Sequence, residues 1–464
     1  MDEDFLGEEV KSIVQRYEKM LRNKTADYFD AETLVQIADY YIQTDKLKKA
    51  YQVIQYAQDL YPNETAFYIK LAELHTINSK YDEAIDCIEK AEIYEPYNTD
   101  LLLQKGEVYL LLNQLAEADE CFNKCLMFCD NRIDMLFEIA YIYENCDRPA
   151  IAINYLDEIL RTEPDNEQAY FSSAICCEQL ERYDEAIAKY NALIDIDPYN
   201  ESAWYNLGVA YAKAGKHKEA IDAFDYCLAI DESFSLAHFN KANSYADLND
   251  YPNAIESYKE VIKLEGGDSI AYCNLGGCYE RMEELALARE SYKKATQLNP
   301  NVAEAWFGIG LTYDKENKLK EALQYFRRAV LLEPENTEYI LVLAETEYRM
   351  NNIAEADKLY EQLLEIDPGM MEAWLDWSFI KYSEGNIKEA ADMLREAIKT
   401  NNDCHQYHYR MVCYLYDLSL VKEALAHLEI ALSLNFEDYF LMFEISPKLQ
   451  RVPEILLAIE MYRK

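Results

Sequence analysis

Cysteine and histidine are the residues of this chain with the greatest potential for chemistry: it has 12 Cys and 6 His. Cys121, Cys125 and Cys129 recur every four residues, so one helix face would carry all three thiols, and Cys146 follows nearby. Four converging thiolates would suit zinc or a metal cluster. The alternative is that these side chains pack as small apolar groups.

A second cluster, Cys404, His405, His408 and Cys413, has ligand types that also suit zinc. None of the six histidines lies in a nucleophile or metalloprotease motif, and no glycine-rich phosphate loop occurs. We therefore expect no cofactor, no metal and no enzymatic activity, and the question becomes which elements carry these residues.

A period of 34 residues organises the chain. Stepping by 34 from Ala50 meets alanine every time: Ala50, Ala84, Ala118, Ala152, Ala186, Ala220, Ala254, Ala288, Ala322, Ala356, Ala390, Ala424 and Ala458. A second column, from Ala38 to Ser378, holds only Ala, Gly or Ser, and Val412 is its first departure. Prolines such as Pro62 and Pro96 keep the same register. Self-similarity at this period is typical of a repeat array.

Each period reads as two amphipathic helices. In 201–234, Trp204, Leu207, Gly208 and Tyr211 share one helix face, and small residues let the two backbones approach. Residues that tolerate left-handed backbone lie between the helices, at Asn113, Gly215, Asn249, Asn317, Asn351 and Gly385. Good N-caps for the following helix are Asn98, Asn166, Asn200 and Asn336.

The pattern Trp204-x-x-Leu207-Gly208-x-x-Tyr211, followed by Ala220 and Phe224, resembles the tetratricopeptide repeat. The resemblance implies an all-α fold, a right-handed superhelical solenoid of about twelve helix-turn-helix repeats with capping helices at both ends. In this register Cys125 and His408 stand in columns that elsewhere hold Ala and Trp, which favours packing over metal binding.

The repeats cover residues 31–438 as tandem 34-residue units. We expect residues 1–30 to provide an N-terminal capping helix, with Phe5 and Leu6 among its apolar residues, and 439–464 to form a degenerate final repeat that caps the other end. Gly266-Gly267 suggests a flexible joint, or simply an irregular turn.

The resemblance also implies that positions two, five, six, nine, twelve and thirteen of each repeat face a concave groove. Position five is aromatic in several repeats, at Phe137, Phe171, Tyr205, Phe239 and Phe307. Such a strip could hold peptide side chains, or it could bury against neighbouring helices. Position six is asparagine at Asn206, Asn240 and Asn274, whose amides could pair with a peptide backbone or simply be exposed.

Position nine is acidic in the first three repeats, at Asp39, Glu73 and Glu107. These carboxylates could favour Lys or Arg on a partner, or they could be plain surface charge. No repeat combines Lys at position five with Asn at position nine, so the carboxylate clamp of the family's chaperone-binding members is not expected.

The charge balance is strongly acidic, with 86 Asp+Glu against 45 Lys+Arg and a net charge of −41. Nucleic acid and anionic membrane are therefore not expected as partners. The start of the chain does not resemble a secretory signal, which favours a cytoplasmic protein with reduced thiols. We expect a scaffold or adaptor that binds an extended peptide or protein segment in its groove. The alternative is a structural assembly subunit or spacer, and the sequence leaves the oligomeric state open.

Overall fold

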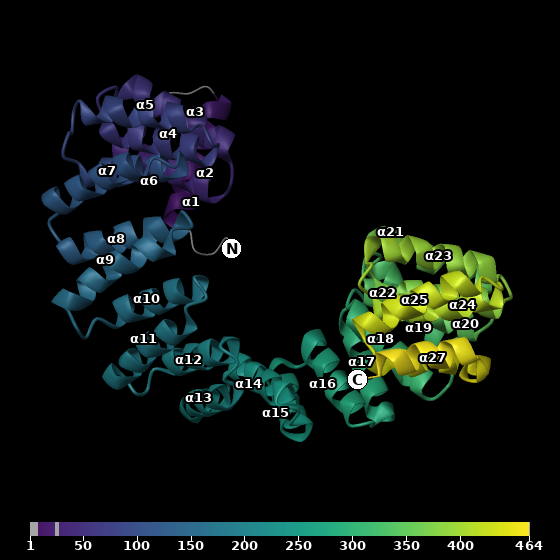
Figure 1. Cartoon of the computed structure of the whole chain (residues 1–464). Helices are drawn as coiled ribbons and strands as arrows, with labels where there is room; N and C mark the ends of the chain where they lie inside the picture. Colours follow the sequence, from purple (N-terminus) through teal and green to yellow (C-terminus); the bar gives the residue numbers. More distant parts are fainter. Residues whose placement is uncertain (1–7, 24–26, 464) are drawn as a thin grey trace. The chain divides into compact units, whose positions relative to one another are not determined.

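The computed structural model describes residues 8–23 and 27–463, and it divides the chain into two compact units, Met1–Glu232 and Ser233–Lys464 (Figure 1). Within the described residues every regular element is helical. The helices of the first unit are α1 (Glu8–Asn23), α2 (Ala31–Gln43), α3 (Leu47–Leu60), α4 (Thr65–Ile77), α5 (Tyr81–Glu92), α6 (Thr99–Leu111), α7 (Leu115–Phe128), α8 (Arg132–Asn145), α9 (Pro149–Thr162), α10 (Glu167–Gln179), α11 (Tyr183–Ile196), α12 (Glu201–Lys213) and α13 (His217–Ile230).

The second unit continues the same alternation and ends in short helices. Its elements are α14 (Ser235–Asp247), α15 (Tyr251–Glu265), α16 (Ser269–Arg281), α17 (Leu285–Leu298), α18 (Ala303–Lys315), α19 (Leu319–Leu332), α20 (Thr337–Arg349), α21 (Ile353–Ile366), α22 (Met371–Ser383), α23 (Ile387–Thr400), α24 (His405–Asp417), α25 (Val421–Leu434), η2 (Glu437–Phe440), α26 (Leu441–Ile445), η3 (Pro447–Arg451) and α27 (Pro453–Tyr462). None of the described helices is long and apolar enough to cross a membrane.

The turn between the two helices of each repeat has one residue with left-handed backbone. These residues recur every 34 positions: Asp45, Ser79, Asn113, Asp147, Glu181, Gly215, Asn249, Glu283, Asn317, Asn351, Gly385 and Ser419. The six predicted from sequence are all confirmed. The other six include Glu and Ser, which rarely adopt this conformation and therefore give no sequence signal.

The predicted helix starts are also confirmed. The side chains of Asn98, Asn166, Asn200 and Asn336 each accept a backbone N–H of the following first turn. Such a cap satisfies an N–H that the helix itself leaves unpaired. The asparagine column therefore fixes where the first helix of these repeats begins.

Small residues hold the two helices of a repeat together. Alanines of the Ala50 column are fully buried from Ala50 to Ala390, and Ala424 is nearly so, whereas Ala458 in α27 is only half-buried. In the second column an added Cβ at Gly106 would lie 2.4 Å from the ring of Phe122, and at Gly208 it would lie 2.5 Å from Phe224. The aromatic ring of the second helix therefore occupies the space where a larger residue of the first would have its side chain.

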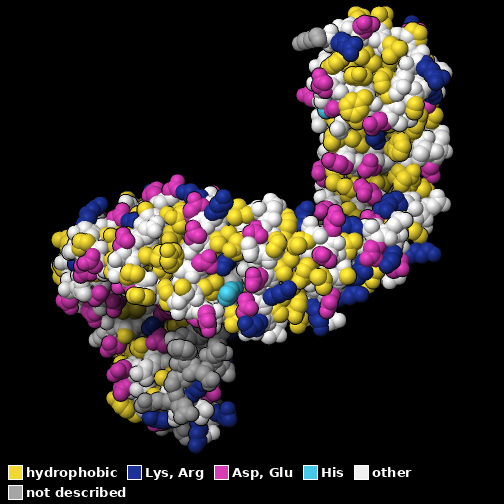
Figure 2. Space-filling view, turned by 90° about the horizontal axis from the view of Figure 1, so that it is seen from below, with side chains coloured by type: hydrophobic (Ala, Val, Ile, Leu, Met, Phe, Trp, Pro, Cys, Tyr) yellow, Lys and Arg dark blue, Asp and Glu magenta, His cyan; other side chains and the backbone are white. Residues whose placement is uncertain are grey.

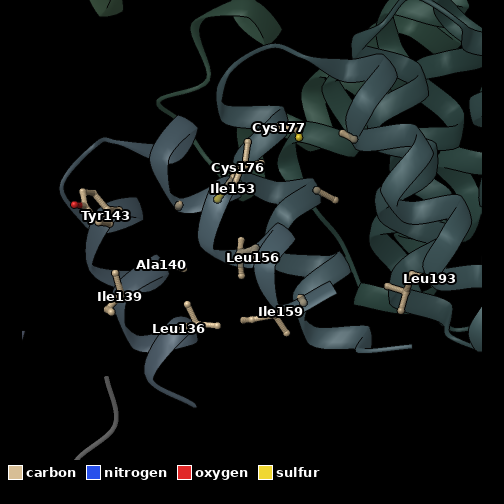
Figure 3. Close-up of a cluster of buried hydrophobic side chains, with 14 of the residues drawn as sticks. Leu136, Ile139, Ala140, Tyr143, Ile153, Leu156, Ile159, Cys176, Cys177 and Leu193 are labelled. Atoms are coloured by element: carbon tan, nitrogen blue, oxygen red, sulfur yellow. The ribbon is translucent and has the colours of Figure 1, made fainter. Parts of the chain in front are cut away.

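The core runs along the stacked helices. Figure 3 shows part of it in the first unit, where Leu136 of α8 lies beside Ile159 of α9. Cys176 belongs to the same buried cluster. Each second helix contributes to the core on both sides, so a repeat is stabilised by its neighbours as well as by its own helix pair.

The two ends of the repeat array are closed differently. Val14, Tyr17 and Met20 of α1 are buried in one cluster with residues of α2 and α3; Phe5 and Leu6 of the predicted capping helix lie outside the described residues. At the other end, residues of α26, η3 and α27 join the core of α24 and α25. Pro447 and Pro453 stand at the starts of η3 and α27.

The Gly266-Gly267 pair forms the C-terminal end of α15, and both residues have positive φ, 71° and 129°. Only Gly adopts the second value without strain. The sequence boundary between the two compact units lies one repeat earlier, after Glu232.

Candidate functional site

The aromatic residues at position five pack against the second helix of their own repeat. The ring centroids of Phe171 and Tyr190 are 6.2 Å apart, and those of Phe239 and Tyr258 are 5.8 Å apart. Phe137 and Tyr205 are, like Phe171 and Phe239, half-buried. These four rings therefore have one side in the core and one side toward the surface.

Phe307 departs from this arrangement. It is only 6% exposed, and its ring stacks on Tyr339 of the next repeat at 4.4 Å and lies 5.4 Å from Phe326. The prediction that it lines a peptide groove is wrong, because its neighbours already cover the ring. The alternative stated above, burial against neighbouring helices, describes it correctly.

The position-six asparagines are half-buried. Asn206 donates its side-chain amide to the carbonyl oxygen of Ser202 at 2.8 Å, and Asn274 donates to Oδ1 of Asn243 at 3.4 Å. Asn240 is also half-buried. A ligand that used the amide N–H groups of Asn206 and Asn274 would have to share or replace these bonds.

The three acidic residues near the N-terminus do not act alike. Nζ of Lys70 lies 2.7 Å from Oδ1 of Asp39 and 2.9 Å from Oε2 of Glu73, so both carboxylates already form an ion pair. Glu107 has no ion pair within the described chain, and burial, reinforced by the nearby Glu73, raises its pKa. The sequence did not indicate that Lys70, at position six, pairs with both Asp39 and Glu73. Lys70 therefore offsets part of the negative charge expected at position nine, and an acidic N-terminal groove stays a prediction.

Two adjoining surface cavities lie along the first helices of the fourth, fifth and sixth repeats. Cavity A, about 320 Å³, is lined by residues of α8, α9 and α10, and cavity B, about 510 Å³, by residues of α10 to α12 and the turn before α12. Gln168 of α10 lines both. Phe137 belongs to cavity A and Phe171 to cavity B, so two of the predicted aromatic residues are brought to this site.

The polar lining of these cavities was not predicted. It includes the carboxylates of Glu138 and Glu144 in cavity A and those of Glu167, Asp197 and Glu201 in cavity B, with no Lys or Arg in either lining. Glu138 stands at position six, which was considered only for its asparagines, and Glu144 stands at position twelve, whose residues were not considered. Over the face drawn in Figure 2, by contrast, acidic side chains are interspersed with basic and apolar ones.

A row of polar contacts joins consecutive first helices near their C-terminal ends. Lys213 pairs with Glu178 at 2.8 Å, and Lys315 pairs with Glu280 at 3.0 Å. In the first of these pairs the hydroxyl of Tyr190 donates to the same carboxylate at 2.8 Å. The partners are 35 residues apart, positions twelve and thirteen of successive repeats, so these groove positions serve repeat stacking.

Most residues of the cysteine and histidine clusters are buried, whereas Cys129, Cys146 and His405 are half-buried. Burial raises the pKa of Cys121 to about 11 and that of Cys125 to about 12, so both are protonated thiols at neutral pH. His408 is buried, and its Nδ1 lies 2.8 Å from Nδ1 of His427. No group of three or more potential ligands able to hold a metal ion occurs in the part of the chain that the structure describes.

Comparison with known families agrees with this architecture. Family models described as tetratricopeptide repeat match residues 99–131, 202–234, 235–268, 269–302, 303–336 and 349–411, and one described as TPR repeat matches 178–215. The chain belongs to the tetratricopeptide repeat family. Proteins of this family generally bind other proteins, and the family is typically non-enzymatic, so the fold supports a general role as a protein-interaction scaffold.

Several solved tetratricopeptide-type structures are similar to parts of the chain. A crystal structure of MamA is 26% identical and covers 36% of this chain and 97% of its own, with a TM-score of 0.34. The C-terminal part of a TPR repeat-containing protein from Cytophaga hutchinsonii is 18% identical over 51% of this chain and 97% of its own, with a TM-score of 0.44. No curated protein matches the chain in sequence.

Proposed function

We propose that this tetratricopeptide repeat protein is an adaptor that binds an extended segment of a partner protein along the first helices of its repeats. The net charge of −41 makes a protein a better partner than a nucleic acid or an anionic membrane. Twelve free thiols suit a reducing compartment, so we place the protein in the cytoplasm.

One observation carries the proposal. Cavity A is lined by Phe137, Glu138, Tyr141 and Glu144, which are positions five, six, nine and twelve of one repeat. Across from them, Ser172 of α10 contributes position six of the next repeat. A hollow formed by these positions between successive first helices can receive side chains of a segment that runs along the stack.

Site-specific photo-cross-linking tests this proposal. A photoreactive phenylalanine analogue replaces Ser172, which lines cavity A, and a control chain carries it at Ala188, which is exposed on α11 and lines neither cavity. In lysate of the native cell we expect a discrete cross-linked partner at position 172 and none at 188. Equal cross-linking at both positions, or none at 172, would contradict groove binding.

The asparagines provide a second test of the same function. Asn206, Asn240 and Asn274 changed together to Ala should weaken partner retention in co-purification while the helical circular dichroism stays unchanged. The physical reason is that Asn amides can donate to and accept from a peptide backbone. Unchanged retention would remove the asparagines from the proposed site and leave the cavities to carry it.

A structural subunit that associates with its own copies remains the second candidate, because α27 has an apolar exposed side. Leu456, Leu457 and Met461 are 45%, 62% and 76% exposed. Light scattering over a range of concentrations tests this function. If self-association occurs through α27, Leu457→Glu together with Met461→Glu should abolish a concentration-dependent increase in mass; a constant monomer mass for the unmodified protein would refute it.

A further inference from the structure

We infer that the joined surface of cavities A and B selects a partner segment in which basic side chains alternate with apolar ones. The inference rests on the proposed function and adds the chemical class of the ligand. It places the charge-selective region over α8, α10 and α12 in repeats four to six, whereas the acidic residues that the sequence alone suggested lie in repeats one to three.

The first support is the sign of the lining charges. Five carboxylates, those of Glu138, Glu144, Glu167, Asp197 and Glu201, line the two cavities, and neither lining contains Lys or Arg. In so acidic a chain an excess of carboxylates is expected by composition alone. The number of carboxylates therefore does not show that the cavities select a basic ligand. The deciding observation is whether cations of the chain itself neutralise these carboxylates.

The second support is that the carboxylates of these cavities have no ion pair in the described structure, although acids on the same helices do. Asp157 of α9 pairs with Lys189 at 2.6 Å, and Glu178 of α10 pairs with Lys213 at 2.8 Å. Within the cavities, Glu144 accepts only a neutral amide N–H, from Gln179 at 3.3 Å. Asp197 accepts the backbone N–H of Tyr199 at 3.0 Å. Cationic side chains of a ligand could form ion pairs with these carboxylates.

The third support is the aromatic lining between the acids. Phe137 and Phe171 have one side in the core and the other toward the cavities, and Tyr141 and Tyr199 are 62% and 79% exposed at the same sites. Aromatic faces bind aliphatic side chains, and they also attract Lys and Arg groups. The combination of aromatic surface with unpaired carboxylates fits a segment that is both apolar and basic, since a purely charged segment would leave the rings unused.

The shared residue Gln168 gives the order of the contacts. Because it lines both cavities, an extended segment that leaves cavity A enters cavity B directly. In an extended chain, successive side chains point to opposite sides, so every second residue faces the protein. When the apolar residues face the rings, the residues between them point away, and a long side chain such as Lys or Arg can bend back from there to the carboxylates of the cavities.

Peptide binding tests this inference directly. The probes are three fluorescein-labelled octapeptides, (Lys-Leu)₄, (Ser-Leu)₄ and (Glu-Leu)₄, titrated with the full-length protein and followed by fluorescence anisotropy. We expect the Lys-Leu peptide to bind at least tenfold more tightly than the Ser-Leu peptide, and its affinity to fall with rising NaCl. Equal affinity for the three peptides would overturn charge selection.

A matched pair of variants distinguishes binding at this site from nonspecific attraction to an acidic chain. The site variant combines Glu138→Gln, Glu144→Gln, Glu167→Gln and Glu201→Gln. The control combines the same change at four exposed glutamates of the second helices, each at position nineteen of its repeat: Glu83, Glu117, Glu185 and Glu219. Both variants gain the same net charge, and circular dichroism establishes that both are folded.

We expect the site variant to weaken Lys-Leu binding at least tenfold and the control less than threefold. Equal weakening by both would reduce the effect to nonspecific attraction and overturn the inference. The proposed function has its own outcome: if the cross-linker at Ser172 captures a partner segment without Lys or Arg, groove binding stands and selection for basic side chains falls.

Discussion

Ser173 of α10 is fully buried, and its hydroxyl has no hydrogen-bond partner among the described residues. Ser378 of α22 is equally buried, but its hydroxyl bonds to the carbonyl oxygen of Leu375 at 3.0 Å. The two serines allow the cost of an unpaired hydroxyl to be measured within one chain. Ser173→Ala removes an unsatisfied polar group and should raise the free energy of unfolding by about 1 kcal/mol, whereas Ser378→Ala should lower it by a similar amount.

Urea denaturation of the two serine variants checks this prediction. The expected result is opposite shifts of the midpoint relative to the unmodified chain. If both variants were destabilised alike, the hydroxyl of Ser173 would have a partner, and its loss would be the common cause.

The contact between His408 and His427 predicts a dependence of stability on pH. Nε2 of His408 lies 3.2 Å from the carbonyl oxygen of Asn402, which can only accept, so Nε2 carries the hydrogen and Nδ1 accepts from His427. Burial, with smaller contributions from His408 and Arg395, lowers the pKa of His427 to about 4, and burial also lowers the pKa of His408. Both rings are therefore neutral in the folded chain near neutral pH.

Because the folded-state pKa of His427 lies below the ordinary value of about 6.5, the unfolded chain binds its proton first as the pH falls. The stability that the neutral ring contributes is thus present above about pH 6.5 and is lost as the pH falls toward 4. His427→Gln removes this dependence. Urea midpoints at pH 7.5 and 5.5 should differ less for the variant than for the unmodified chain, and equal differences would refute the role of this pair.

At the scale of single residues, the sequence predicted local roles such as helix capping better than side-chain contacts between repeats. Asn98 and the other capping residues could be named because a cap depends only on the chain next to it. Lys70 could not be interpreted in the same way, because its pairing with Asp39 and Glu73 depends on side-chain directions across two repeats. For the same reason Phe307 looked like its half-buried column mates, although Tyr339 of the following repeat covers its ring.

At the scale of the helix pair, α16 carries two adjacent glycines with different surroundings. A Cβ added at Gly276 would lie 2.7 Å from the ring of Tyr292, whereas at Gly277 the nearest neighbouring atom would be 3.7 Å away. Gly276→Ala should therefore destabilise the chain by about 1–3 kcal/mol through overpacking. Gly277→Ala has room for its methyl group and should stabilise the helix by about 0.5–1 kcal/mol.

Thermal denaturation followed at 222 nm compares the two glycine variants. Their expected shifts have opposite signs although the substitutions are chemically identical and neighbouring. A stabilising effect of Gly276→Ala would mean that the Tyr292 ring can move aside at little cost and that the small-residue column does not limit helix approach.

The helices and their register were predictable because one 34-residue period fixes the small residues, the caps and the turns together. The sequence could not show which positions of the first helix remain open. In several repeats ion pairs such as Glu178–Lys213 occupy positions twelve and thirteen, whereas Glu144 at position twelve lines cavity A. This difference follows only once successive first helices are placed side by side. The cavities at α8, α10 and α12 were missed for the same reason.

For the whole molecule, the net charge of −41 predicts how stability responds to salt. Excess charge of one sign repels itself in the compact state, and salt screens this repulsion. We expect the melting temperature to rise by a few degrees between 20 and 300 mM NaCl at pH 7.5. Differential scanning calorimetry measures it, and a fall would mean that the surface ion pairs, which salt also weakens, contribute more than the net repulsion costs.

The polar contacts between successive first helices join residues 35 apart in the chain, as in Glu178–Lys213 and Asp314–Arg349. In each of these contacts, the residue of the preceding repeat has therefore already been synthesised when its partner emerges. While the nascent chain leaves the ribosome, the growing end can dock on what has already folded, without waiting for distant segments. Synthesis and folding can proceed in the same direction, one helix pair at a time.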